Sequence, residues 1–100
     1  MMKILAIERE HPGISAEQFQ PYLKLEAARL WELYQRGQVR EAYFHADQHT
    51  AVLVLECLNI EEAGKILQAL PLVEAGLITF ELLPLIPYDG YARLFEVSSS

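Results

Sequence analysis

Basic residues, cysteine and signature motifs are scarce in this sequence, and each shortage excludes a class of function. Only 8 lysines and arginines stand against 14 aspartates and glutamates, which gives a net charge of −6, and no basic run occurs. A surface that binds nucleic acid must be basic, because it displaces the counterions of the phosphates. We therefore expect neither DNA nor RNA as a partner.

The single cysteine, Cys57, excludes an internal disulfide and any metal site built from several thiolates. The apolar stretch within residues 1–10 is too short for a signal peptide or for a membrane span. From these two features we predict a cytoplasmic protein without a membrane partner.

Motifs for cofactors and common catalytic groups are missing as well. The sequence contains no glycine-rich phosphate loop, nucleophile elbow, zinc pattern or dinucleotide-binding fingerprint. Its three histidines are His11, His45 and His49. The last two are four residues apart, but on a predicted strand and its turn rather than on one helical face, so they do not form a metal-ligand set. We expect no cofactor and no metal.

What the sequence does contain is a chain of one-domain size. It has 100 residues, of which 52% are hydrophobic, enough for one domain with one core. We predict a single domain over residues 1–97, which includes an irregular apolar C-terminal arm at 84–95. Residues 98–100 are expected to be a disordered tail.

Hydrophobic patterning predicts six main elements in the order β-α-β-β-α-β. Ser15 and Asn59 are predicted N-caps, each followed by a partner three residues later, and Gly37 and Pro71 are predicted helix stops. Pro21 leaves two alternatives: a separate turn before it, or a helix that begins early enough to tolerate it. The strands are predicted at 3–9, 40–46, 51–57 and 77–83.

This order is that of the ferredoxin-like split βαββαβ fold, an α+β fold in which two helices cover one face of a four-stranded antiparallel sheet. The longer helix carries apolar residues at helical spacing, which predicts that they lie in the core. These residues are Leu23, Ala27, Leu30, Trp31 and Tyr34.

The two middle strands allow a prediction of which side chains share a face. If Ala46 and Ala51 are opposite each other at the turn, one face is purely apolar and meets the helices. That face carries Ala42, Phe44, Ala46, Ala51, Leu53 and Leu55. The other face carries Glu41, Tyr43, His45, Val52, Val54 and Glu56.

The mixed character of this second face predicts that something covers it. It is too apolar for a solvated surface and too polar for a core, so a cavity or a subunit interface is expected there. The arm carries five more large apolar side chains, Ile86, Tyr88, Tyr91, Leu94 and Phe95. We predict a homodimer or higher homo-oligomer in which the arm packs on the partner or closes its cavity; the alternative is an arm that packs on its own protomer.

Cofactor-free proton transfer needs a group that titrates near neutral pH in an apolar pocket, with a hydrogen-bond donor nearby. His45 is the predicted base, Tyr43 lies two residues away on the same face, and Glu56 lies across the hairpin. These three residues form the predicted catalytic site. The alternative is that they are polar interface groups that hydrogen-bond to the partner.

The segment from Glu32 to Leu72 resembles the muconolactone isomerase family. The similarity lies in Leu33–Gly37 at the helix end, Arg40 at the start of the second strand, Glu56 at the end of the third, and Leu70–Leu72. The resemblance implies a small α+β protein that forms dimeric or larger α/β barrels.

The sequence departs from this family at two places. The family's enzymes have a second strand rich in tryptophan and arginine, whereas Glu41–His45 has neither. Val73–Gly76 stands where they have an aromatic-proline-aromatic stretch. The resemblance therefore supports the family's fold for this sequence more strongly than it supports the family's reaction.

The resulting hypothesis is a dimeric α/β barrel that binds a small organic molecule, as a cofactor-free isomerase of the muconolactone isomerase type that acts by proton transfer. A cofactor-free monooxygenase-like enzyme is one alternative. A non-catalytic dimerisation or accessory module is the other.

Overall fold

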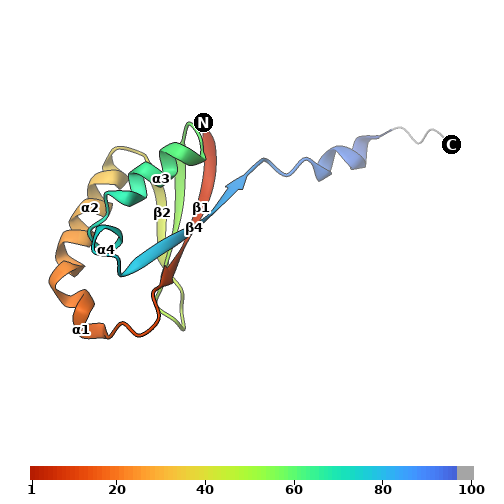
Figure 1. Ribbon diagram of the computed structural model, residues 1–100. Coiled ribbons are helices and arrows are strands. Elements are labelled where there is room, and N and C mark those ends of the chain that lie inside the picture. Colours follow the sequence, from red (N-terminus) through yellow and green to blue (C-terminus); the bar gives the residue numbers. More distant parts are fainter. Residues whose placement is uncertain (97–100) are drawn as a thin grey trace.

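The computed structural model describes residues 1–96 as a four-stranded antiparallel sheet with helices on one face and a projecting C-terminal arm (Figure 1). The sheet order is β2-β3-β1-β4. The strands are β1 (Met2–Glu10), β2 (Val39–Phe44), β3 (Ala51–Cys57) and β4 (Ile78–Leu85). This confirms the predicted α+β, ferredoxin-like split βαββαβ fold.

The helices begin and end largely where local sequence signals place them. They are α1 (Ala16–Phe19), a 3₁₀ turn (Gln20–Tyr22), α2 (Leu23–Gln35), α3 (Ile60–Gln68) and α4 (Pro71–Glu74). Pro21 lies in the 3₁₀ turn, so the alternative with a separate turn is the one observed. Pro71 does more than end a helix, because it also starts α4.

Both predicted N-caps form. The side chain of Gln18 accepts a hydrogen bond from the backbone N–H of Ser15 at 2.9 Å. Asn59 Oδ1 accepts one from the N–H of Glu62, also at 2.9 Å. These bonds satisfy N–H groups that a helix start leaves without partners.

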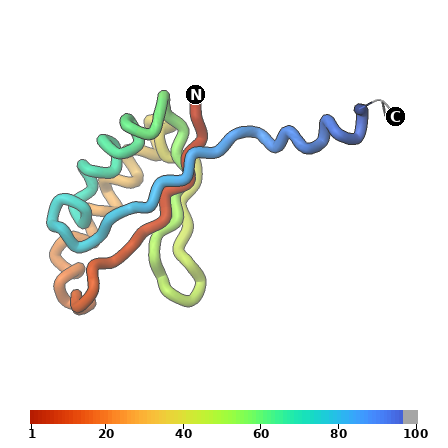
Figure 2. Tube along the Cα trace, turned by 45° about the vertical axis from the view of Figure 1, so that its right-hand side comes forward, coloured from red at the N-terminus to blue at the C-terminus, as the bar shows by residue number. Residues whose placement is uncertain are grey.

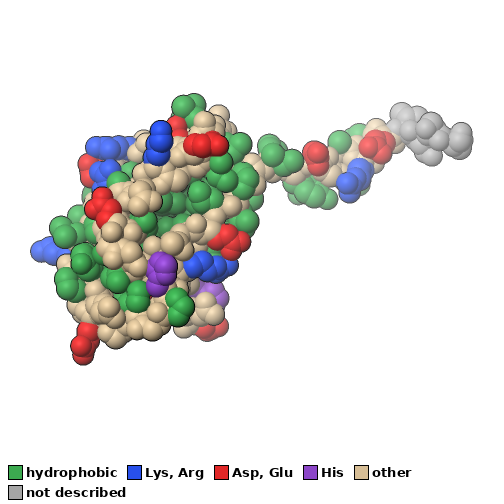
Figure 3. Space-filling view, viewed as in Figure 1, with side chains coloured by type: hydrophobic (Ala, Val, Ile, Leu, Met, Phe, Trp, Pro, Cys, Tyr) green, Lys and Arg blue, Asp and Glu red, His purple; other side chains and the backbone are tan. Residues whose placement is uncertain are grey.

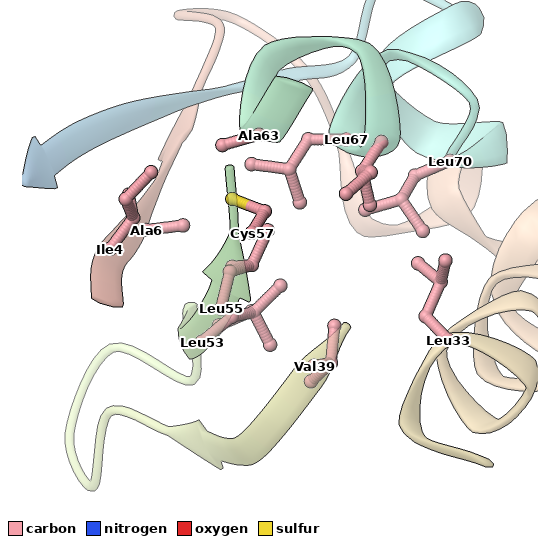
Figure 4. Packing of buried hydrophobic residues seen from close by; sticks show 12 residues of the cluster. Ile4, Ala6, Leu33, Val39, Leu53, Leu55, Cys57, Ala63, Leu67 and Leu70 are labelled. Atoms are coloured by element: carbon pink, nitrogen blue, oxygen red, sulfur yellow. The ribbon is translucent and has the colours of Figure 1, made fainter. Parts of the chain in front are cut away.

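The core lies between the sheet and α2 and α3 (Figure 4). Leu53, Leu55 and Cys57 of β3 point toward Leu67 of α3 and Leu33 of α2. Leu55 is fully buried, and burial of such a side chain contributes about 1.5–3 kcal/mol. None of the helices within residues 1–96 has both the length and the apolar character needed to cross a membrane.

The register of the central hairpin differs from the prediction. Ala51 pairs with Phe44 rather than with Ala46, because the connection comprises residues 45–50 and is longer than a four-residue turn (Figure 2). The shift is two residues, so the pairing moves while the side chains of Glu41–Phe44 and Ala51–Glu56 stay on their predicted faces; His45 and Ala46, predicted as strand residues, lie in the connection. A bulge at Arg40, between Val39 and Glu41, separates the start of β2 from this register.

Three aromatic residues predicted in the core are exposed. Phe44 is 63% exposed, Trp31 59% and Tyr34 53%. Trp31 and Tyr34 stack on each other, with ring centroids 5.5 Å apart, on the outer side of α2. The residues that the helix buries are Glu26 and Leu33, neither of which belongs to the predicted stripe.

The C-terminal arm leaves the body of the protomer (Figures 1 and 2). It starts after β4, which includes Pro84 and Leu85 and is an edge strand, where a proline is tolerated. A 3₁₀ helix, Gly90–Phe95, gives it more regular structure than predicted.

Ile86 is 79% exposed and Phe95 83%, so within the described residues the arm does not pack on its own protomer. Hydrophobic side chains alternate along it with charged ones (Figure 3). The predicted tail at 98–100 lies outside the described residues.

Candidate functional site

A cavity of about 650 Å³ lies between the sheet and the segment from α1 to α2. Its volume is within the range of small-molecule sites, roughly 300–1,000 Å³. Leu23, Ala27 and Leu30 of α2 line one side, and Ala42 and Leu53 of the sheet line the other. Three residues of the predicted core stripe therefore do point at the sheet, but across an open space.

Two buried glutamates stand in this largely apolar wall. Glu8 of β1 and Glu26 of α2 both line the cavity, and each side chain belongs to a residue that is only 7% exposed. Glu8 follows Ile4 and Ala6 on the helix-facing side of β1, because alternate strand residues share a face. Neither glutamate forms an ion pair with lysine or arginine among residues 1–96.

One oxygen of each carboxylate is held by the backbone. Glu8 Oε1 accepts a hydrogen bond from the N–H of Ala51 at 3.1 Å, at the start of β3. Glu26 Oε1 accepts one from the N–H of Leu72 at 3.0 Å, in the first turn of α4. These contacts join β1 to β3 and α2 to α4, and they account for one oxygen of each group.

The second oxygen of each carboxylate remains available. Within the described residues Oε2 of Glu8 and Oε2 of Glu26 have no hydrogen-bond partner, and neither is completely enclosed by protein. Because both residues line the cavity, these oxygens are the acceptors that a bound molecule would meet.

Burial raises the pKa of both carboxyl groups. For Glu8, desolvation is the main cause, the negative charge of Glu10 adds to it, and the Ala51 N–H and His49 oppose it. For Glu26, desolvation again dominates, the charge of Glu8 adds to it, and the Leu72 N–H lowers the pKa in part. The pKa values of the two groups are thus raised in the same cavity, and their charges interact.

An aromatic pair borders the cavity where it meets solvent. The Phe44 ring stacks on the His49 imidazole, with centroids 4.0 Å apart and an interplanar angle of 17°. His49 has φ of 58°, in the left-handed region that few residues other than glycine adopt. The backbone N–H of His49 donates to the carbonyl of His45 at 2.9 Å, which helps to hold this conformation.

The predicted site residues do not meet in this cavity: Tyr43 is among its lining residues, whereas His45 and Glu56 are not. Tyr43 and Glu56 belong to the sheet face away from the helices, where the Tyr43 hydroxyl donates to Glu41. That hydrogen bond, together with the Glu41 charge, raises the pKa of Tyr43. Arg40 Nε lies 3.3 Å from Glu56 Oε2, so two of the residues on which the family resemblance rests are in contact.

His45 follows β2, and its side chain is engaged in the turn. Its Nδ1 accepts hydrogen bonds from the backbone N–H groups of Asp47 and Gln48, at 3.1 and 3.0 Å. No hydrogen bond joins His45 to Tyr43 or Glu56 within the described residues. A catalytic role for these three residues stays a prediction. Among residues 1–96 no three acidic, histidine or cysteine side chains are placed to hold a metal ion.

Comparison with solved structures shows the same fold in an enzyme. The chain is similar to 5-chloro-2-hydroxyhydroquinone dehydrochlorinase from Burkholderia phenoliruptrix AC1100, solved in complex with 2,5-dihydroxybenzoquinone, with a TM-score of 0.61. The match covers 85% of this chain and 94% of that chain at 18% sequence identity. Identity at this level supports a shared fold only. No family model matches the sequence, and no curated protein matches it.

Sequence reasoning missed Glu8, Glu26 and His49 as site residues. For Glu8 a signal was present, since a carboxylate at an alternate position after Ile4 and Ala6 falls on the apolar face of β1. Glu26 likewise lies four residues before Leu30 on α2. His49 carried no such signal, because its position depends on the length of the β2–β3 connection.

Proposed function

We propose that this chain is a cytoplasmic homodimeric α/β barrel protein that binds a small organic molecule in the helix–sheet cavity and moves a proton on it without a cofactor. The reaction class is isomerisation of the muconolactone isomerase type. The observation that carries the proposal is the pair of buried carboxylates, Glu8 and Glu26, in the wall of one apolar cavity.

The chemistry follows from the position of the two groups. A general base works best when its pKa lies near the working pH, and desolvation moves both carboxyl groups in that direction. The charge of Glu8 disfavours ionisation of Glu26, so the pair favours one ionised and one protonated member. The ionised group accepts a proton from the ligand, and the protonated group donates one at the opposite wall.

A purely structural role for the glutamates is the competing explanation. It accounts for the hydrogen bonds to Ala51 and Leu72, but it leaves the second oxygens facing a cavity at an energetic cost. The dehydrochlorinase of the same fold adds support, because its structure contains a small quinone.

The test is a thermal-shift screen of lactones, quinones and phenols on three proteins. We expect at least one class to stabilise the natural protein, and Ala27→Phe to abolish that shift, because Ala27 lines the cavity. Ala28→Phe is the matched control, since Ala28 is exposed on the same helix and does not line the cavity. Equal ligand shifts in both variants would place binding outside the cavity.

The homodimer belongs to this proposal because residues 1–96 leave one face of the sheet uncovered. Leu5, Ile7, Val52, Val54 and Leu83 are apolar residues of that face, and none of them is fully buried in the protomer. A second copy placed there would bury this surface and form a closed barrel from two sheets. The same face would then bring Tyr43 and Glu56 to the interface.

A further inference from the structure

The charge of the cavity wall points to the class of ligand, and this step rests on the function proposed above. Three glutamates line the cavity, namely Glu8, Glu10 and Glu26, together with one imidazole, that of His49. No lysine or arginine lines it among the described residues. An anion bound there would meet carboxylates without a compensating cation, which is costly in a desolvated site.

The arginines on neighbouring surfaces are engaged elsewhere. Arg29 of α2 pairs with Glu32 at 2.9 Å, on its own helix. Arg9 of β1 pairs with Glu81 at 2.6 Å, on the face of the sheet away from the helices. Movement of either side chain into the cavity would break an existing ion pair.

The hydrogen-bonding groups of the wall fit a hydroxyl group. Of the free oxygens of Glu8 and Glu26, the one on the ionised group accepts and the one on the protonated group can donate, and a hydroxyl can both donate and accept. Most of the remaining wall is apolar, and the flat surface of the Phe44–His49 pair borders it. This combination matches a planar ring with a hydroxyl group.

We propose that the cavity selects uncharged ring molecules that carry hydroxyl groups and discriminates against the corresponding carboxylates. The wall supplies a carboxyl group at two sides and apolar contact between them, and within the described residues it supplies no lysine or arginine for an acid. An organic cation is disfavoured for a different reason: desolvation opposes the fully ionised carboxylate pair that would attract it.

The experiment uses three probes that share a 3-hydroxyphenyl ring and differ in one substituent of similar size, which is neutral, anionic or cationic: 3-hydroxybenzyl alcohol, 3-hydroxybenzoate and 3-hydroxybenzylamine. Affinities are measured by calorimetry at pH 7 on the full chain. We expect the alcohol to bind at least about tenfold more tightly than either ion, which corresponds to about 1.4 kcal/mol. Glu26→Gln should reduce the ratio of the affinities for the alcohol and the benzoate, because it removes one potential negative charge from the cavity wall.

Glu61→Gln is the control, since Glu61 is exposed at the start of α3 and does not line the cavity. It should leave all three affinities unchanged. Benzoate binding as tight as that of the alcohol, or tightest binding by the amine, would overturn the inference and leave a cavity-binding function in place. Binding of none of the three overturns it as well, and the thermal-shift screen then decides separately on the proposed function.

Discussion

Phe44 stacks on His49 although the two residues belong to different parts of the hairpin, one at the end of β2 and the other in the connection to β3. The contact explains why a large aromatic residue on the helix-facing side of the sheet is not a core residue. The Phe44 ring borders a cavity, is largely exposed to solvent and contacts the His49 imidazole rather than packed core side chains.

Truncation of this ring should therefore cost little stability. We expect Phe44→Ala to lower the free energy of unfolding by about 1 kcal/mol or less, the value of an exposed aromatic contact. Leu55→Ala is the matched core variant, because Leu55 is fully buried, and it should cost about 2–5 kcal/mol. Urea titration of both variants checks this, and a larger loss for Phe44→Ala would show that the ring is packed.

The buried glutamates should make stability depend on pH. Their pKa values in the folded chain are raised above the ordinary value of 4.5, so folded chains keep protons that unfolded chains have released. The resulting stability is fully present below pH 4.5 and is lost as pH rises through the raised values. We expect the stability of the double variant Glu8→Gln/Glu26→Gln not to decline in this way as pH rises.

Thermal melts of the natural protein and the double variant between pH 4 and pH 8 measure this effect. Glu61→Gln should keep the decline of the natural protein, because its side chain is exposed. Parallel pH curves for the natural protein and the double variant would mean that Glu8 and Glu26 titrate as ordinary surface carboxyls.

Self-association should depend on the uncovered face of the sheet. Val54→Lys places a charge at the centre of that face, next to Leu5, and we expect it to give monomers. Leu25→Lys is the control, since Leu25 is 60% exposed on α2, on the other side of the molecule. Sedimentation equilibrium distinguishes the two; a natural protein that sediments as a stable monomer at micromolar concentration would contradict the dimer itself.

Removal of the arm should weaken association without unfolding the protomer. A chain that ends at Leu85 loses Tyr88 and Tyr91, whose rings pack edge to face with centroids 4.8 Å apart and which are 69% and 67% exposed in the protomer. We expect an unchanged unfolding transition, together with a weaker dimer or aggregation from surface that the arm no longer covers. An equally associated and equally soluble truncated protein would show that the arm covers nothing.

His45 offers a test between the two faces of the sheet as the site of chemistry. If the predicted site at His45, Tyr43 and Glu56 acts, His45→Ala should weaken ligand binding or turnover far more than His11→Ala. Its loss of stability should stay near 1 kcal/mol, because only the hydrogen bonds to the turn are lost. Unchanged binding in His45→Ala with loss in Glu26→Gln would assign the chemistry to the cavity alone.

The sequence predicted those features that depend on short-range rules. The caps at Ser15 and Asn59 are local hydrogen bonds, and the faces of β3 follow from strict alternation, so both could be predicted. The burial of Trp31 and Phe44 could not, because it depends on how closely α2 approaches the sheet. That distance is a property of the whole packing arrangement, and an open cavity has no periodic signal.

The connection between β2 and β3 has a consequence for how this protein can vary in length. Because strand side chains alternate between the two faces with a period of two, insertions or deletions of two residues around the connection should preserve the faces of β2 and β3. A single-residue change has to be absorbed in the loop or in a bulge such as the one at Arg40. Tolerated variants should thus differ in length mainly by two residues. Each would reposition His49 relative to the cavity while the fold remained the same.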